Sequence, residues 1–295
     1  MQQATVPLPN VQFFDAHPAA GDSRSELIEG LNKAQKSINP KWFYDAAGSE
    51  LFEEITTLPE YYPTRTELGI LRDNQQSIAA HCGSGCVFIE PGSGSSEKAR
   101  LLLDALRPAA YVPLDISADF LRESAERLGQ EYPWLQVNAV CADFNQGWPF
   151  PDDLPVGKRV VFYPGSTIGN LEPEAAATFL RRVRQVIGDD GGLLVGVDLH
   201  KSSERLHAAY NDASGVTARF NLNVLSRLND MLDADFDQAL FSHKAHYNTR
   251  EQRIEMHLVS EQAQSVRCNG DHIDFAAGET IHTENSYKYT AEGFA

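Results

Sequence analysis

Residues 86–98 read CVFIEPGSGSSEK, the most informative segment of the chain for its fold. The apolar run 87–89 ends in Glu90, and Gly92 and Gly94 follow in a short turn. The polar residues 95–98 then open a helix. Glycines let the backbone approach a ligand closely, and a helix N-terminus offers unpaired N–H groups. The stretch therefore predicts a strand, a glycine turn and a helix that bind a nucleotide.

The spacing of the glycines narrows the choice of nucleotide. Dinucleotide-binding folds use G-x-G-x-x-G, whose third glycine allows the helix to pack closely on the strand. Glu97 stands at that third position here. The pattern acid-x-Gly-x-Gly at Glu90, Gly92 and Gly94 is similar instead to the first motif of S-adenosylmethionine (SAM)-dependent methyltransferases. An ordinary tight strand–helix turn is the alternative.

Length and charge exclude several classes of protein. The chain has 295 residues and 42% hydrophobic residues, enough for a sizeable core. Its 25 Lys and Arg against 41 Asp and Glu give a net charge of −16, which repels nucleic acid. No apolar run reaches membrane-spanning length, and no leader pattern opens the chain. We expect a cytoplasmic monomer with a small-molecule substrate and neither nucleic-acid nor membrane partners.

The cysteines give no sign of a metal site. Cys82 and Cys86 bracket Gly-Ser-Gly and His81 adjoins them, but this spacing matches no usual zinc pattern. The other two, Cys141 and Cys268, stand apart. We expect reduced, inert thiols and no metal.

The order of apolar runs predicts an α/β protein. Expected strands are 87–90, 111–114, 136–141, 160–163 and 193–197, and the expected helices between them are 95–106, 117–128 and 173–187. Such alternation implies a parallel sheet with helices on both faces. Two helical patterns follow residue 200, and from residue 253 the sequence alternates as in β-strands. This change predicts a second, α+β lobe.

Open α/β sheets bind ligands beyond the carboxyl ends of their strands. One expected strand ends at Asp115, whose carboxylate can accept both ribose hydroxyls; a helix cap shared with Ser117 is the alternative. The next strand ends at Asp143 and Phe144, which suit the adenine amino group and ring. Their alternative is a loop acid beside a core phenylalanine.

Two further groups of polar residues suit an amino-acid substrate. Asn170, in GSTIGN, can hold an amine or a carboxylate, or can cap the helix that opens at Pro173. Glu284 and Ser286 lie two apart in an expected strand, so both point to one face. An acid and a hydroxyl together satisfy both nitrogens of an imidazole. A solvated strand face is the alternative.

Five segments together carry a resemblance to a known family. They are FYDAAGSELFEEITTLPEYYPTRTE, EPGSGSSEK, PLDIS, YPGSTIGNLEP and TENSYKY. They resemble the histidine-specific Nα-methyltransferases, over nearly the whole chain. The resemblance implies a Rossmann-like class I methyltransferase sheet with a second α+β substrate-binding lobe. It also implies SAM as methyl donor, S-adenosylhomocysteine as product, and successive methylation of the α-amino group of L-histidine to trimethylhistidine (hercynine), in ergothioneine biosynthesis.

Matched residue by residue, the resemblance implies two sets of site residues. The methyl donor would contact Gly92, Lys98, Asp115 and Asp143, beside Glu90, Ser93, Gly94 and Phe144. The amino and carboxylate groups of histidine would be held by Tyr44, Asn170 and Tyr210, with Tyr61 close by and Glu284 and Ser286 on the imidazole. Tyr44 and Asn170 are the expected catalytic groups. The general base stays open between a tyrosine and a water near Asn170.

The resemblance also sets expectations for the domains. We expect residues 1–65 and 201–286 to form the substrate-binding lobe, residues 66–200 the methyltransferase core, and residues 287–295 a return to that core. Family members usually continue into a further helix and strand pair, so the sheet is expected to lack strands. Asn285 and Tyr287 differ from the residues most common at these positions in the family. Their side chains are expected to face away from those of Glu284 and Ser286.

Three other functions stay open. They are a methyltransferase of the same family that acts on another amino acid or amine, an NAD(P)-dependent oxidoreductase, and a non-catalytic nucleotide-binding protein.

Overall fold

The computed structural model describes residues 8–16, 20–144 and 147–294. The chain forms two compact units. Unit 1 comprises Met1–Pro18, Thr66–Pro164 and Glu174–Gly196. Unit 2 comprises Ala19–Arg65, Gly165–Pro173 and Val197–Ala295. None of the described helices is long and apolar enough to cross a membrane.

Unit 1 is built on a six-stranded sheet in which every pair of neighbours is parallel, in the order β1-β5-β4-β3-β6-β7. The strands are β1 (Val11–Asp15), β3 (Val87–Pro91), β4 (Ala110–Asp115), β5 (Gln136–Cys141), β6 (Arg159–Tyr163) and β7 (Gly192–Val195). From β3 the chain adds β4 and β5 on one side and then β6 and β7 on the other. The strand order therefore reverses beside β3, and ligands of open α/β sheets bind at such a point. The expected parallel α/β sheet is confirmed.

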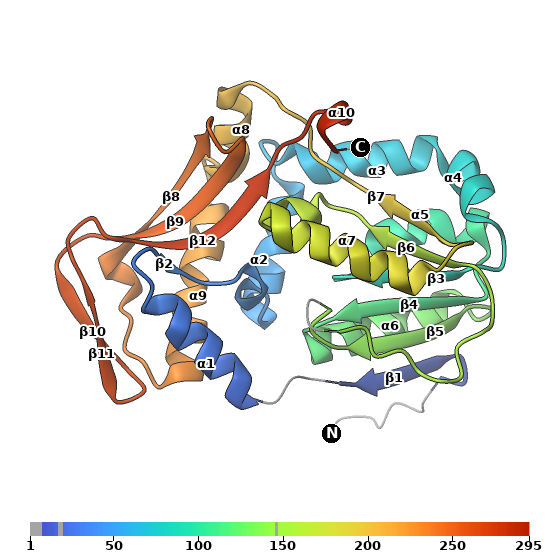
Figure 1. The fold of residues 1–295 in the computed structure, drawn as a ribbon, viewed down its shortest axis with the longest axis horizontal. Coiled ribbons are helices and arrows are strands. Elements are labelled where there is room, and N and C mark those ends of the chain that lie inside the picture. The colour runs from blue at the N-terminus through green and yellow to red at the C-terminus, as the bar shows by residue number, and fades with distance from the viewer. Residues whose placement is uncertain (1–7, 17–19, 145–146, 295) are drawn as a thin grey trace. The chain divides into compact units, whose positions relative to one another are not determined.

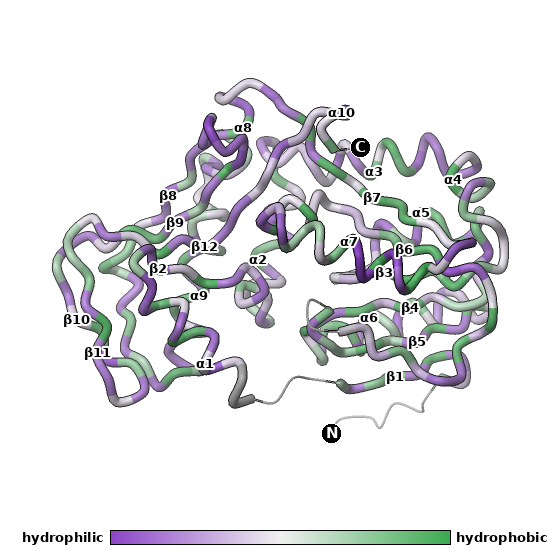
Figure 2. The backbone as a smooth tube through the Cα atoms, in the orientation of Figure 1, coloured by the Kyte–Doolittle hydropathy of each residue, from purple (hydrophilic) through white to green (hydrophobic). Residues whose placement is uncertain are grey.

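Helices cover both faces of this sheet (Figure 1). They are α3 (Tyr62–Asp73), which begins in unit 2, and α4 (Gln75–Cys82), α5 (Glu97–Leu106), α6 (Ala118–Glu131) and α7 (Pro173–Ile187). Neighbouring residues of β6 show the two faces. Phe162 stacks on Phe88 at 5.3 Å in the core under α5 and α6, whereas Tyr163 meets Phe179 of α7 at 4.4 Å. Both faces are buried, which explains the continuous apolar runs visible in Figure 2.

Unit 2 contains a four-stranded sheet in the order β2-β12-β9-β8 and a two-stranded ribbon of β10 and β11. The strands are β2 (Lys36–Ser37), β8 (Phe241–Asn248), β9 (Arg253–Ser260), β10 (Gln264–Cys268), β11 (Asp271–Phe275) and β12 (Thr280–Tyr287). The helices are α1 (Ala20–Leu31), η1 (Pro40–Phe43), α2 (Ala46–Thr57), η2 (Thr167–Asn170), α8 (Ser203–Tyr210), α9 (Val216–Leu232), η3 (Gln238–Leu240) and α10 (Ala291–Phe294). The expected α+β lobe is confirmed.

The faces of the unit 2 sheet differ sharply. Ile254, Met256 and Leu258 of β9 join the apolar side chains of α9 in one core, so this is the core face of the sheet. The residues between them, Glu255 and His257, point to the opposite face because side chains alternate along a strand. We call that opposite face the outer face.

A bulge in β12 decides which of its residues reach the core face. His282 pairs with His257, but Glu284 pairs with Met256, because the register shifts between His282 and Glu284. Glu284 and Ser286 therefore lie on the core face, opposite Met256 and Ile254. Asn285 and Tyr287 lie on the outer face, as the alternation predicted.

Three parts of the domain expectation are wrong. Residues 11–15 form β1, which pairs with β5 in the unit 1 sheet rather than belonging to the substrate-binding lobe. Val11 and Phe13 pack on the unit 1 core, a role that so short an apolar run among prolines did not reveal. Residues 165–173 and 197–200 belong to unit 2, not to the core. The C-terminal residues also stay in unit 2, where Tyr289 forms a bridge with Leu199.

Candidate active site

The glycine turn of unit 1 adopts the conformation that its sequence predicted. Gly92 and Gly94 have φ angles of 68° and 51°, which side-chain-bearing residues rarely adopt. The N–H of Gly92 donates to the carbonyl of Leu114 at 2.7 Å. The turn is thereby fastened to the end of β4, and α5 begins directly after it.

Asp115 connects the turn to its neighbouring strand. Its Oδ2 accepts the N–H of Gly94 at 3.0 Å, and its Oδ1 accepts the N–H of Ser117 at 3.0 Å. Burial raises the pKa of Asp115, and these backbone donors oppose the shift. The expected cap contact with Ser117 is therefore present. The backbone N–H of Ile116 also donates to this carboxylate. A carboxylate offers about four lone-pair sites, so one remains to accept a ribose hydroxyl.

Two features beside the turn fit a bound nucleoside. The Oγ atom of Ser93 is buried and has no hydrogen-bond partner among the described residues. A buried hydroxyl without a partner is costly unless a ligand bonds it. The ring of Phe144 lies over the turn, since a methyl group on Gly92 would be 3.6 Å from its Cε1 atom. A flat ring at this place suits an adenine.

The other three expected cofactor residues have different surroundings. Glu90 is 2% exposed and hydrogen-bonds the hydroxyl of Tyr111, and burial raises its pKa to about 8. Lys98 forms an ion pair with Glu67 at 2.7 Å. Asp143 is buried where β5 ends. Contact of these three side chains with the cofactor stays a prediction.

In unit 2, Ser286 stands at the centre of a buried hydrogen-bond network. Its Oγ accepts the hydroxyl of Tyr210, at the end of α8, at 2.7 Å. The same oxygen accepts the ammonium of Lys288 at 2.7 Å. Both lone pairs of the oxygen are thus filled, so the Ser286 hydroxyl proton is left to be donated elsewhere.

The positive charge of Lys288 is balanced within this network. Lys288 is 3% exposed, and its Nζ lies 3.1 Å from Oδ2 of Asp198. Lys201 contacts the other oxygen of Asp198 at 2.6 Å, and the hydroxyl of Tyr62 donates to Oδ2. Burial disfavours the charge of Asp198, but Lys288 and Lys201 outweigh it and lower its pKa. Burial lowers the pKa of Lys288, and Asp198 opposes that shift.

This supporting network was not predicted from the sequence. Tyr62 and Lys288 lie within two of the segments that resemble the family, Tyr62 in the one that ends in YYPTRTE and Lys288 in TENSYKY. The resemblance could therefore have pointed to both residues. Asp198 and Lys201 carried none, because only the fold brings them to Lys288.

Glu284 is the carboxylic acid among the expected substrate residues. Burial raises its pKa to about 7, against the attraction of Lys288. No hydrogen bond to its carboxylate is formed by the residues that the structure describes. The carboxylate and the Ser286 hydroxyl therefore offer one acceptor and one donor on the same face of β12.

The expected tyrosines belong to one aromatic group in unit 2. The ring of Tyr61 meets that of Tyr210 at 6.2 Å and that of Phe52 at 6.4 Å, both edge-on. The ring of Tyr44 meets Phe52 at 5.6 Å and Phe220 at 5.9 Å. Core packing therefore accounts for part of these contacts. The structure nevertheless connects Tyr44, through Phe52 and Tyr61, to the ring whose hydroxyl bonds Ser286.

Asn170 is positioned by the packing of η2 against β12. Gly169 makes this approach possible, since a methyl group there would lie 3.0 Å from the carbonyl oxygen of Tyr287. Glu172 fastens the segment by accepting the side-chain amide of Asn285 at 2.9 Å and the hydroxyl of Tyr287 at 2.6 Å. Asn170 is thereby held next to the strand that carries the acceptor and donor.

The predicted residues thus fall into two groups, the cofactor set in unit 1 and the substrate set in unit 2. The four cysteines are buried free thiols, as expected.

Comparison with known proteins identifies the family. The description of the SAM-dependent, histidine-specific methyltransferases matches residues 23–295. The chain is 47% identical, over 287 residues, to the histidine N-alpha-methyltransferase of Mycolicibacterium smegmatis, covering 95% of this chain and 88% of that protein. It is 31% identical, over 279 residues, to the ergothioneine biosynthesis protein 1 of Schizosaccharomyces pombe, covering 90% of this chain and 36% of that protein.

A third relative has a different named substrate. The chain is 27% identical, over 283 residues, to the 4-dimethylallyltryptophan N-methyltransferase of Aspergillus fumigatus, covering 90% of this chain and 83% of that protein. The match to the family description nevertheless extends over nearly the whole chain. This protein belongs to the SAM-dependent, histidine-specific methyltransferases.

Proposed function

We propose that this protein methylates the α-amino group of L-histidine in successive steps to trimethylhistidine, in ergothioneine biosynthesis, with SAM as methyl donor. The observation that carries the proposal is the pairing of Glu284 with Ser286 on the core face of β12. One offers an acceptor without a partner among the described residues, and the other offers a hydroxyl proton that its neighbours leave unused.

This pair matches the two nitrogens of a neutral imidazole. One ring nitrogen carries a proton and donates, and the other has a lone pair and accepts. Glu284 would accept from the first, and Ser286 would donate to the second. Lys288 and Tyr210 keep the Ser286 hydroxyl in the donating orientation because they fill its lone pairs. Together these contacts would select one imidazole tautomer.

The cofactor would be held by the turn of unit 1. The carboxylate of Asp115 would accept a ribose hydroxyl beside its three backbone donors, and Ser93 has a buried hydroxyl that needs a partner. Phe144 would stack on the adenine. When bound, SAM supplies an electrophilic methyl group on a sulfonium. The residues that contact it supply position rather than acid–base chemistry.

The histidine amine must reach the methyl group deprotonated, because an ammonium has no lone pair. Tyr44 and Asn170 would orient this amine, with the base a tyrosine or a water near Asn170. Desolvation lowers the pKa of an amine, which favours the reactive form. As methyl groups accumulate, the nitrogen becomes permanently cationic. The faces of Tyr44, Tyr61 and Tyr210 suit such a group through cation–π attraction.

A tryptophan-derived amine is the second candidate substrate, since one relative is named for such a compound. An indole has one N–H donor and no acceptor lone pair in its ring plane. It could satisfy Glu284, but the Ser286 hydroxyl would be left without an acceptor. Such a mismatch of buried polar groups costs about 1–3 kcal/mol. The pair therefore favours histidine.

The test compares L-histidine with its two ring-methylated analogues, each blocked at one ring nitrogen. We expect both analogues to bind at least about 10-fold more weakly than L-histidine, because each loses one hydrogen bond and adds a clash. Binding of L-tryptophan serves as the comparison for the second candidate. If either blocked analogue, or L-tryptophan, bound as tightly as L-histidine, the assignment of the pair to imidazole would be wrong.

A further inference from the structure

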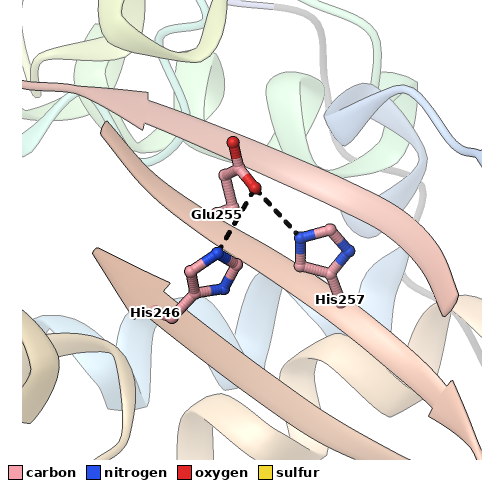
Figure 3. A group of neighbouring side chains, drawn as sticks. All are labelled: His246, Glu255 and His257. Atoms are coloured by element: carbon pink, nitrogen blue, oxygen red, sulfur yellow. Dashed lines mark hydrogen bonds and ion pairs between the residues drawn. The ribbon is translucent and has the colours of Figure 1, made fainter. Parts of the chain in front are cut away.

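The outer face of the unit 2 sheet carries a second group of chemically active side chains (Figure 3). His246 of β8 lies directly opposite Glu255 of β9, and His257 follows two positions along the same strand. All three therefore point to the same face of the sheet. Glu284 and Ser286 point to the other face, so the methyl-transfer proposal uses none of these three residues.

The nitrogen and oxygen atoms of this cluster lie close enough together to share one ion. Oε2 of Glu255 lies 3.3 Å from Nε2 of His257 and 3.5 Å from Nε2 of His246. One ligand atom from each residue lies within 4.8 Å of the other two. Two imidazoles and one carboxylate are a common ligand set for divalent transition metals.

Glu255 is oriented by neighbours outside the cluster. Its Oε1 accepts from Nε of Arg253 at 2.8 Å and from the amide of Asn248 at 3.0 Å. Oε2 is thereby turned toward the histidines. Arg253 also contacts Glu172 at 2.8 Å, so two carboxylates balance its single positive charge. Second contacts of this kind fix the direction of a ligand and increase metal affinity.

The cluster is closed on one side and accessible on the other. The side chains of Glu255 and His257 are 10% and 11% exposed, whereas that of His246 is 38% exposed. An ion could enter past His246 and keep a water as its remaining ligand.

We propose that His246, Glu255 and His257 bind a divalent transition-metal ion, Zn²⁺ by preference, at a site separate from the methyl-transfer residues. The ion would join β8 to β9. Cysteine spacing alone predicted no metal, since these three ligands meet only once the two strands pair.

The test is calorimetric titration of the ligand-free protein with Zn²⁺ in a buffer without chelators. We expect one equivalent to bind to the wild type, and the visible absorption of Co²⁺ added instead should show a low-symmetry site with nitrogen ligands. His246→Ala should weaken Zn²⁺ binding by more than about 100-fold, since it removes a direct ligand. His246 is half-exposed, so this change leaves the fold intact, which the unfolding temperature without metal checks.

The matched control is His272→Ala, which removes an exposed histidine of β11 in the same unit. We expect it to bind Zn²⁺ as the wild type does. The proposal is overturned if the wild type binds no Zn²⁺, if His246→Ala binds it unchanged, or if His272→Ala weakens it equally. Histidine and S-adenosylhomocysteine binding should stay unchanged in His246→Ala, so failure here and failure of the proposed function are distinguishable.

Discussion

At the scale of single residues, a substitution of Glu284 should change the binding of the substrate and not that of the cofactor. We expect Glu284→Gln to raise the KM for L-histidine by about 10- to 100-fold, because a hydrogen bond to a charged acceptor contributes about 1.5–3 kcal/mol. Steady-state kinetics with varied L-histidine measures the effect, and the Kd of S-adenosylhomocysteine should not change.

The control for this substitution is Glu251→Gln, which neutralises an exposed acid of the same unit. It should leave the KM for L-histidine as in the wild type. Unchanged histidine kinetics in Glu284→Gln would contradict the role of Glu284.

Glu284 should also make the ligand-free protein less stable at high pH. Its pKa is about 7 in the folded protein against an ordinary value of 4.5. Below pH 4.5 it is protonated in both the folded and unfolded states and has no effect. Between these values the unfolded state loses the proton first, so the free energy of unfolding falls as pH rises, and above pH 7 the full penalty is present.

Glu284→Gln should therefore raise the free energy of unfolding by about 3 kcal/mol at pH 8 and leave it unchanged at pH 4. Denaturant titration at the two pH values measures this difference. A stabilisation equal at both values would show that the ionisation of Glu284 is not its cause.

At the scale of elements, the packing of η2 against β12 brings the segment that ends in Asn170 next to the strand that carries Glu284 and Ser286, the pair proposed to bind the imidazole. We expect Gly169→Ala to move η2 by a few tenths of an ångström, since its methyl group would meet the backbone of Tyr287 at 3.0 Å. The KM for L-histidine should rise by about 10-fold, because misplaced positioning groups weaken binding and catalysis.

Gly69→Ala is the matched control, as a methyl group there meets nothing within 4 Å on helix α3. It should leave the KM for L-histidine unchanged and stabilise the helix by up to about 1 kcal/mol. A wild-type KM in Gly169→Ala would mean that Asn170 does not act on the substrate.

A substitution at the end of β4 should instead change the binding of the cofactor and not that of L-histidine. Asp115→Asn removes the charge that would accept the ribose hydroxyls, so we expect the Kd of S-adenosylhomocysteine to rise by about 10-fold or more. Calorimetry measures this Kd. Asp119→Asn, at an exposed position in the first turn of α6, should bind the cofactor product as the wild type does. An unaltered Kd in Asp115→Asn would remove Asp115 from the cofactor site.

The elements of unit 1 were largely predictable because their signals are local. Parallel strands buried on both faces read as continuous apolar runs, and the expected range 136–141 is that of β5. The strand β1 was missed because its short run depends on pairing with the distant β5. The bulge in β12 gave no sequence signal either. The faces of Glu284 and Ser286 were nevertheless predicted correctly, because the register shift lies before them.

At the scale of the whole molecule, the contacts that the sequence could not predict are long-range ones. Lys288 meets Asp198 only because distant segments of the chain fold into the same unit. The presence of two units was predictable, because the alternation of strand and helix patterns stops after residue 200. Their boundaries were not, because short segments such as Gly165–Pro173 belong to a different unit from their flanks.

Histidine methylation is tested by calorimetric titration with L-histidine, with and without S-adenosylhomocysteine, followed by mass spectrometry after SAM is added. We expect L-histidine to bind and then to gain mass in successive methyl steps up to the trimethylated product. If S-adenosylhomocysteine binds but L-histidine neither binds nor gains a methyl group, the claim that this protein methylates histidine is contradicted.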